Sequence, residues 1–430
     1  MGMVVRACMA LPAPPRSTVG EAAAMKSSTS RTGGGRVLVL GGTGRVGWST
    51  ATALSKLRPD LNILIGGRNR EKGTSLASKL GKRRSEFVQV DIHDASMLEE
   101  ALYGVDLVVH AAGPFQREDK CTVLEAAIST KTPYVDVCDD VDYSWRAKGF
   151  HEQAKASGVP AIITAGICPG VSNVMAAELV HSARGKKACK PERLSFSYYI
   201  AGSGGLGPTT LASSFLLLGE DAIAYNKGEE IKLKPYSGVL NIDFGKGVGK
   251  KNVYLLNLPE VKSVFKCLNV PTVSARFGSD PFFWNWGMHA FANFLPIDIL
   301  RDKSKVLKLV EVIDPIVRSI DGIAGESVSM RVDLEFSNGQ NTLGLFTHRK
   351  LSTSVGYAAT AFALAILEGN TQPGVWFPEE PQGIATKARK LLLQRATQGA
   401  TNFVINKTSW MVESGNWSEL KFLRNLCVRM

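Results

Sequence analysis

Short apolar runs alternate with helical segments between residues 36 and 164, and this alternation constrains the fold more than any other feature. Each run is apolar along most of its length, as expected for strands that are buried on both faces of a sheet. The six runs are 36–40, 61–65, 87–90, 106–111, 134–137 and 159–164. Short connections and strict β/α alternation predict a doubly wound parallel sheet with helices on both faces.

The first connection is a glycine-rich turn with the sequence Gly41-Gly42-Thr43-Gly44-Arg45-Val46-Gly47. It follows the first strand and opens a helix, which is the arrangement of a dinucleotide-binding Rossmann unit. Glycines let backbone N–H groups approach a diphosphate, and the start of the following helix attracts negative charge. We therefore expect these seven residues to bind a dinucleotide.

The end of the second strand discriminates between NAD and NADP. An acidic residue there would bind the ribose 2′-hydroxyl, but this chain has Gly66-Gly67-Arg68-Asn69-Arg70 instead. A guanidinium suits a 2′-phosphate because it donates charge-assisted hydrogen bonds in a fork. Arg68 and Asn69 therefore predict NADP(H) in preference to NAD(H), with a solvated basic loop as the alternative.

Two further strand ends complete the expected cofactor site. Asp91 follows the third strand and is expected near the adenine. The fourth strand ends in Ala111-Ala112-Gly113-Pro114-Phe115, and its small residues leave room for a cofactor in the crevice of the sheet. Phe115 is expected to shield the nicotinamide from the substrate side.

The remaining chain predicts a second unit and a return to the first. We place the Rossmann domain at 36–170 and an α+β substrate or dimerisation domain with a mostly antiparallel sheet at 171–350. The Asn338-Gly339 turn between two alternating segments predicts a hairpin in it. Residues 351–430 are expected to form helices that pack on the Rossmann domain again.

Residues 1–35 differ in composition from the rest. They hold four basic residues against the single acid Glu21 and are rich in Ser, Thr and Ala. This composition is typical of an organelle transit peptide, and a disordered tail is the alternative. A plastid stroma is the expected location, with mitochondrion or cytoplasm as alternatives.

The motif order resembles that of the saccharopine dehydrogenase-like (saccharopine reductase) family. The resemblance rests on the glycine turn, Gly67-Arg68, Ala111–Phe115, Tyr134-Val135-Asp136 and the segment 166–173. It implies a Rossmann domain with an inserted substrate domain and NADPH-linked reduction of imines or similar bonds. It also implies that Ala112, Gly113 and Pro114 lie along the nicotinamide ribose, and that Asp136 and Pro169-Gly170 border the substrate.

One residue departs from the pattern of that family. Members that make saccharopine often carry Asp immediately before the Pro-Gly pair, where this chain has Cys168. Cys168 is a candidate weak proton donor or a buried, inert thiol. Asp136 is a candidate acid/base, with a structural carboxylate as the alternative. Gly204 and Gly205 lie in a glycine-rich loop before a helix, where they would bind an anionic substrate group or act as a hinge.

Composition limits the partners of the chain. The net charge of +12 comes from dispersed basic residues without a nucleic-acid motif, so no nucleic-acid partner is expected. The cysteines show no metal-ligand spacing, so no metal is expected. Aromatic residues gather in 281–294. Four interpretations of this cluster stay open: the lining of an apolar substrate cavity, a homodimer face, a membrane contact, or ordinary core packing.

Hydride transfer from NADPH to a C=N, C=O or C=C bond of an apolar substrate is the leading interpretation, and a lipid or quinone reductase is a further alternative. A short-chain dehydrogenase is excluded because none of the nine tyrosines has Lys four positions later. The alternative is a non-catalytic NADP-binding or interaction protein, since no unmistakable acid/base pair stands out.

Overall fold

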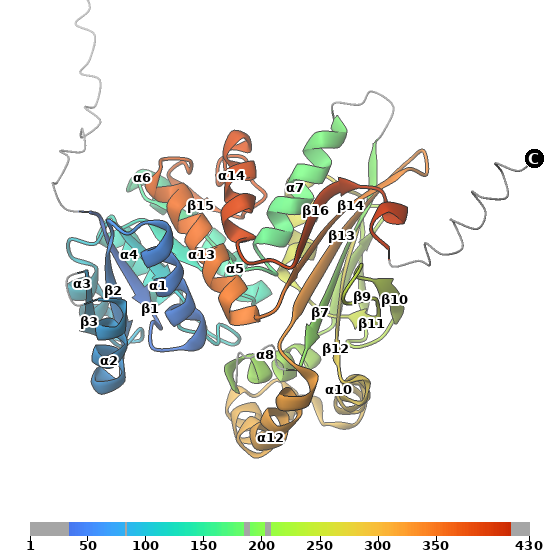
Figure 1. Ribbon diagram of the computed structural model, residues 1–430, viewed down its shortest axis with the longest axis horizontal. Coiled ribbons are helices and arrows are strands. Elements are labelled where there is room, and N and C mark those ends of the chain that lie inside the picture. Colours follow the sequence, from blue (N-terminus) through green and yellow to red (C-terminus); the bar gives the residue numbers. More distant parts are fainter. Residues whose placement is uncertain (1–33, 82–83, 185–189, 203–207, 414–430) are drawn as a thin grey trace, which may run out of the picture.

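The computed structural model describes residues 34–81, 84–184, 190–202 and 208–413. Within these residues the chain forms two sheets that lie next to each other, each with its own helices (Figure 1). Apart from β15 and β16, which come from the C-terminal segment, the first sheet is built from the N-terminal half and the second from the middle of the chain. The predicted transit peptide at residues 1–35 lies almost entirely outside the residues that the structure describes.

The first sheet has seven parallel strands in the order β15-β6-β5-β4-β1-β2-β3. Its strands are β1 (Arg36–Leu40), β2 (Asn62–Gly67), β3 (Ser85–Gln89), β4 (Leu107–His110), β5 (Tyr134–Asp136), β6 (Pro160–Ile162) and β15 (Gly374–Trp376). The alternation of side chains explains why the runs are apolar throughout. Val37 and Val39 pack into one core and Leu38 and Leu40 into another, so that β1 is buried on both faces.

Helices cover both faces of this sheet. They are α1 (Arg45–Leu57), α2 (Arg70–Leu80), α3 (Ala95–Leu102), α4 (Thr122–Ser129), α5 (Val141–Lys148), α6 (His151–Ala156), α13 (Leu351–Leu367) and α14 (Thr386–Ala396). Helices α1, α2 and α13 share one core with the sheet, while α3 to α6 share the other. The expected doubly wound fold is confirmed.

The second sheet has the order β10-β11-β12-β7-β13-β14-β16, with β8 and β9 attached beside β12. Only β7 and β12 pair in parallel, and the other pairs are antiparallel. Its strands are β7 (Pro191–Ala201), β8 (Ala222–Asn226), β9 (Glu229–Leu233), β10 (Leu240–Asp243), β11 (Lys250–Leu255), β12 (Thr272–Asp280), β13 (Val328–Phe336), β14 (Asn341–His348) and β16 (Asn402–Lys407). The mostly antiparallel sheet and its β13–β14 hairpin match the expectation.

Helices of the second unit lie at two places. α7 (Val171–Arg184) and α9 (Pro259–Leu268) pack against the sheet and join the core that continues into the first unit. A separate core is formed by α8 (Pro208–Leu218), α10 (Phe282–Phe294), α11 (Ile297–Leu300) and α12 (Lys303–Ala324), at the lower edge of Figure 1. A 3₁₀ turn, η1 (Ser409–Met411), follows β16.

The C-terminal segment joins both units and differs from the expectation of helices alone. α13 packs on α1, and β15 extends the first sheet beside β6. β16, however, pairs with β14 and adds a strand to the second sheet. Because the segment crosses between the sheets, one hydrophobic core runs through both units. No helix in the described parts of the chain is long and apolar enough to cross a membrane.

Candidate functional site

A groove opens where the strand order of the first sheet reverses, between the carboxyl ends of β1 and β4. In open α/β sheets this switch point is where ligands bind. The groove has a volume of about 590 Å³. Its walls include Gly41, Thr43, Gly44, Arg45, Val46, Arg68, Asp91, Ala111, Ala112, Gly113, Pro114 and Phe115. The structure thus brings most of the expected cofactor residues to one place.

The glycines of the turn after β1 contribute in different ways. Gly41 has a φ of +73°, and a Cβ on it would lie 2.6 Å from the carbonyl oxygen of Ala111. A Cβ on Gly47 would lie 2.3 Å from the carbonyl oxygen of Gly41, so this glycine lets α1 approach the turn closely. Gly42 and Gly47 are buried beneath the groove, whereas Gly44 is exposed in its wall.

Of the two cofactor-binding residues predicted at the end of β2, Arg68 and Asn69, only Arg68 lines the groove. Arg68 is exposed and lines the groove. Asn69 does not line it, because its side chain caps α2 by accepting a hydrogen bond of 2.8 Å from the backbone N–H of Lys72. His93, which follows the expected residue Asp91, also lines the groove, and so does Lys120, which the sequence analysis missed because it lies in no motif.

A second cavity of about 210 Å³ adjoins the groove. Val46, Ala111, Gly113, Pro114 and Phe115 line both spaces, so they form a shared wall between them. Most other residues around the cavity are apolar, and the second unit contributes Ile200, Leu217, Leu256, Phe277 and Met288. The cavity therefore accepts an apolar group directly beside the groove.

Asp136 lies away from both spaces. Its side chain is fully buried at the end of β5, where Oδ1 accepts hydrogen bonds from the backbone N–H groups of Cys138 and Thr164 at 3.0 and 2.7 Å. Its Oδ2 accepts from the hydroxyl of Tyr134 at 3.0 Å. Burial raises the pKa of Asp136 to about 6, while these three hydrogen bonds oppose that shift. The geometry is that of a carboxylate that ties strand ends together.

Asp139, three residues further along, lines the apolar cavity and was missed in the sequence. Gln116 Nε2 donates a hydrogen bond of 2.9 Å to its Oδ1, and Ser213 Oγ donates one of 2.8 Å to Gln116 Oε1. This chain of contacts runs from α8 of the second unit to the first unit. Burial raises the pKa of Asp139 above its usual value. A held carboxyl in an apolar cavity suits proton transfer or the binding of a cation.

Two of the three residues in the Cys168-Pro169-Gly170 segment line the apolar cavity. Cys168 and Pro169 line the apolar cavity, and burial raises the pKa of the Cys168 thiol well above its usual value. Gly170 instead lies beneath, where its φ is +128° and a Cβ would lie 2.1 Å from the carbonyl oxygen of Gly166. Gly204 and Gly205 lie outside the described residues.

Comparisons with known proteins identify the relatives of this chain. Residues 37–162 match the family model of the saccharopine dehydrogenase NADP binding domain. This part of the chain is therefore similar to the saccharopine dehydrogenase family. The chain is 25% identical over 272 residues to carboxynorspermidine synthase of Vibrio cholerae, a match that covers 57% of this chain and 63% of that protein.

A solved structure shows the same fold. Apo saccharopine dehydrogenase (L-Glu forming) of Saccharomyces cerevisiae is 14% identical, with a TM-score of 0.62 over 87% of this chain and 100% of that chain. The resemblance seen in the motifs is confirmed, and so is NADP(H) as the cofactor of the matched domain.

The groove fits NADP(H) on its own geometry. A Cβ on Gly44 would meet only the Gly41 carbonyl oxygen, at 3.2 Å, so that this backbone is open to a diphosphate. Arg68, Lys120 and Lys303 bring positive charge to the walls. Among the described residues no group of three or more His, Cys, Asp or Glu side chains is placed to hold a metal ion.

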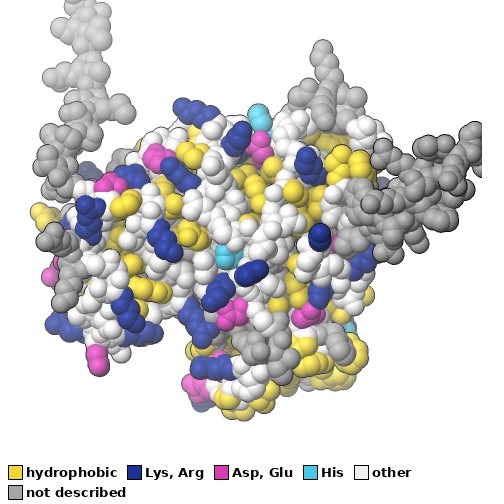
Figure 2. Space-filling view, in the orientation of Figure 1, with side chains coloured by type: hydrophobic (Ala, Val, Ile, Leu, Met, Phe, Trp, Pro, Cys, Tyr) yellow, Lys and Arg dark blue, Asp and Glu magenta, His cyan; other side chains and the backbone are white. Residues whose placement is uncertain are grey.

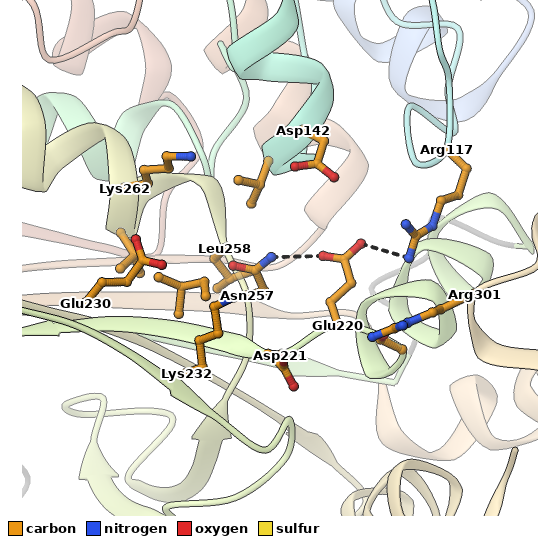
Figure 3. A pocket seen from close by; sticks show the side chains of 14 residues that line it. Arg117, Asp142, Glu220, Asp221, Glu230, Lys232, Asn257, Leu258, Lys262 and Arg301 are labelled. Atoms are coloured by element: carbon orange, nitrogen blue, oxygen red, sulfur yellow. Dashed lines mark hydrogen bonds and ion pairs between the residues drawn. The ribbon is translucent and has the colours of Figure 1, made fainter. Parts of the chain in front are cut away.

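A charged pocket of about 360 Å³ lies on the other side of Leu258, which lines both this pocket and the apolar cavity. Figure 3 shows Glu220 at its centre, between Asn257 and Arg117. Arg117 lies 3.3 Å from Glu220 Oε1, and Asn257 Nδ2 donates to Glu220 Oε2 at 2.9 Å. Arg301 Nε donates to the carbonyl oxygen of Gly219 at 2.9 Å.

The aromatic cluster of 281–294 divides between core and surface. Phe291 packs edge-on against Phe215 with ring centroids 5.3 Å apart. Phe283, Trp286 and Phe294 are exposed, and Figure 2 shows hydrophobic side chains along this lower edge. Met288 is the residue of α10 that reaches the apolar cavity. The aromatic rings of the cluster therefore do not form the cavity wall in the described structure.

Proposed function

We propose that this chain is an NADPH-dependent oxidoreductase that transfers hydride between NADP(H) and a C=N, C=O or C=C bond. The wall that the cofactor groove and the apolar cavity share carries this proposal. A nicotinamide against Ala111–Phe115 would present one face to whatever occupies the cavity. NADP(H) supplies the hydride, and the protein orients it and excludes water.

In this proposal the cofactor lies along the groove in a defined direction. The glycine turn holds the diphosphate, Arg68 binds the 2′-phosphate and Asp91 lies at the adenine end. Ala112, Gly113 and Pro114 lie along the nicotinamide ribose, as the family resemblance implies. These assignments are supported by the positions of the residues in one continuous groove.

Asp139 is the proposed acid/base group in place of Asp136. It lines the cavity, whereas Asp136 has its oxygens engaged by buried donors. Burial raises the pKa of Asp139 above its usual value, which favours a carboxyl that can hold and release a proton. Cys168 borders the same cavity as a neutral thiol, so we assign it to the cavity wall.

The small cavity holds only the reacting part of a larger substrate. The charged pocket lies beyond Leu258. Its walls come from the same segments as those of the apolar cavity, from residues close in sequence to Phe115, Asp139, Leu217 and Leu256. We infer that a polar end of the substrate extends in this direction. Binding there would place charged groups of the substrate beside Arg117 and Glu220.

The two carboxylates allow a matched test. NADPH oxidation with a panel of imines, ketones and enones is expected to identify a substrate of the wild-type protein. Asp139→Asn should lower kcat by about a hundredfold while the Kd for NADPH stays unchanged, because general acid–base catalysis contributes on that order. Asp136→Asn should instead lower the melting temperature. The NH2 group of an asparagine would face the Tyr134 hydroxyl or the Cys138 N–H, which both donate to Asp136, and one of these hydrogen bonds would be lost.

Two results would contradict the proposal. Tight NADPH binding without turnover over the whole panel would favour the alternative of a non-catalytic NADP-binding protein. Full activity of Asp139→Asn would show that the Asp139 carboxyl does not act as the acid/base group.

A further inference from the structure

The second unit contributes a helix to the cofactor groove. α12 begins at Lys303, and both Lys303 and Leu307 line the groove although they belong to the second unit. The two residues are four positions apart, so they lie on the same face of the helix. This face of α12 is therefore turned toward the site that the Rossmann unit forms.

Lys303 bridges the two units by direct contacts. Its Nζ donates a hydrogen bond of 2.6 Å to Glu118 Oε1 and one of 3.3 Å to the carbonyl oxygen of Pro114. Both acceptors belong to the connection after β4. The side chains of Lys303 and Glu118 keep 25% and 31% of their surface exposed, so the ammonium is held in place and remains open to the groove.

The position of this ammonium along the groove is the decisive point. Pro114 belongs to the wall that the groove shares with the apolar cavity, whereas Asp91, the residue expected near the adenine, lines the groove alone. A cation there faces the nicotinamide half of a bound dinucleotide, which carries a phosphate and the ribose hydroxyls. Ammonium donors bind such oxygens well in a partly desolvated groove.

We propose that Lys303 is a cofactor-binding residue supplied by the second unit, and that it binds the nicotinamide half of NADP(H). Glu118 holds its ammonium over the groove. The adenine half is bound by the Rossmann unit alone, while the nicotinamide half is bound by both units. This inference rests on the proposed function, because it assumes that NADP(H) occupies the groove.

The test compares two ligands by isothermal titration calorimetry. NADPH spans the groove, whereas adenosine 2′,5′-bisphosphate contains only the adenine half. Lys303→Met is expected to raise the Kd for NADPH about tenfold and to leave the Kd for the bisphosphate unchanged. Lys303→Arg should restore most of the NADPH affinity. Lys305→Met is the matched control, because Lys305 lies exposed on the same helix and pairs with Asp302 instead.

The outcomes separate this inference from the proposed function. Unchanged NADPH affinity in Lys303→Met, or equal losses for both ligands, would overturn the role of Lys303. A wild-type protein that binds neither NADPH nor the bisphosphate would overturn the proposed function itself. Unchanged bisphosphate binding also shows that the variant is folded.

Discussion

The backbone conformation and the nearest atoms at each glycine of the cofactor groove decide whether a side chain fits there. The turn after β1 has one glycine that needs a positive φ, Gly41, and one that permits close packing of a helix, Gly47. Gly44 has a φ of −81°, and a Cβ on it would make one tight contact, 3.2 Å from the carbonyl oxygen of Gly41, which a small shift of the turn relieves. A side chain at Gly44 would therefore change the groove while leaving the fold intact.

Gly44→Val provides the sharpest test of the groove. We expect it to abolish NADPH binding, because the side chain occupies the space of the diphosphate, while the melting temperature changes little. NADPH fluorescence titration and thermal denaturation measure the two effects. Gly47→Val is the contrasting variant and should unfold the protein. Tight NADPH binding by Gly44→Val would show that the cofactor lies elsewhere.

Arg68 carries the preference for the 2′-phosphate. Arg68→Asp should weaken NADPH binding by about a hundredfold and NADH binding far less, because only NADPH loses a charge-assisted pair and meets a like charge. Dissociation constants for both cofactors measure the effect. Arg70→Asp is the nearby control, since the Arg70 side chain contacts Gln89 instead. Equal losses for the two cofactors would remove Arg68 from the phosphate site.

At the scale of elements, a buried polar cluster joins α7, α9 and the turn after β15. Asn173 Nδ2 donates to Glu379 Oε2 at 3.0 Å, and Tyr198 donates to Glu260 Oε1 at 2.6 Å. Both glutamates are fully buried, and each has one oxygen without a hydrogen-bond partner among the described residues. Burial raises the pKa of both Glu260 and Glu379 to about 7.

This cluster predicts stability that depends on pH. A folded pKa of about 7, raised from 4.5, means that the folded state binds the proton more tightly than the unfolded state. Stability should therefore rise as pH falls from 7 toward 4.5, by on the order of 3 kcal/mol for each glutamate. The cost of the charged form is fully present above pH 7.

Glu379→Gln isolates the effect because glutamine resembles the protonated acid. The variant should be more stable than the wild type at pH 8, and the difference should vanish near pH 4, below the unfolded pKa. Urea unfolding at both pH values measures it. The same difference at both pH values would show that the ionisation of Glu379 does not contribute.

At the scale of the whole molecule, the site forms only where the two units meet. The groove takes its glycine turn from the first unit and Lys303 from the second, and both units contribute apolar side chains to the cavity wall. The C-terminal segment holds the units together, since β15 extends one sheet and β16 the other. A continuous core through α7 and α13 fixes their arrangement.

The sequence by itself determined the features that depend on neighbouring residues. Apolar runs, glycine positions and strand ends are local, so the doubly wound sheet, the groove and the NADP(H) cofactor were all predictable. Tertiary structure decided the rest, because it depends on partners far apart in the chain. Asp136 ends β5 and Asp139 lies three residues beyond it, but Asp136 accepts from the distant Thr164 whereas Asp139 accepts from Gln116, which Ser213 holds. Lys303 reaches the groove from 185 positions beyond Glu118, a distance that no local pattern encodes.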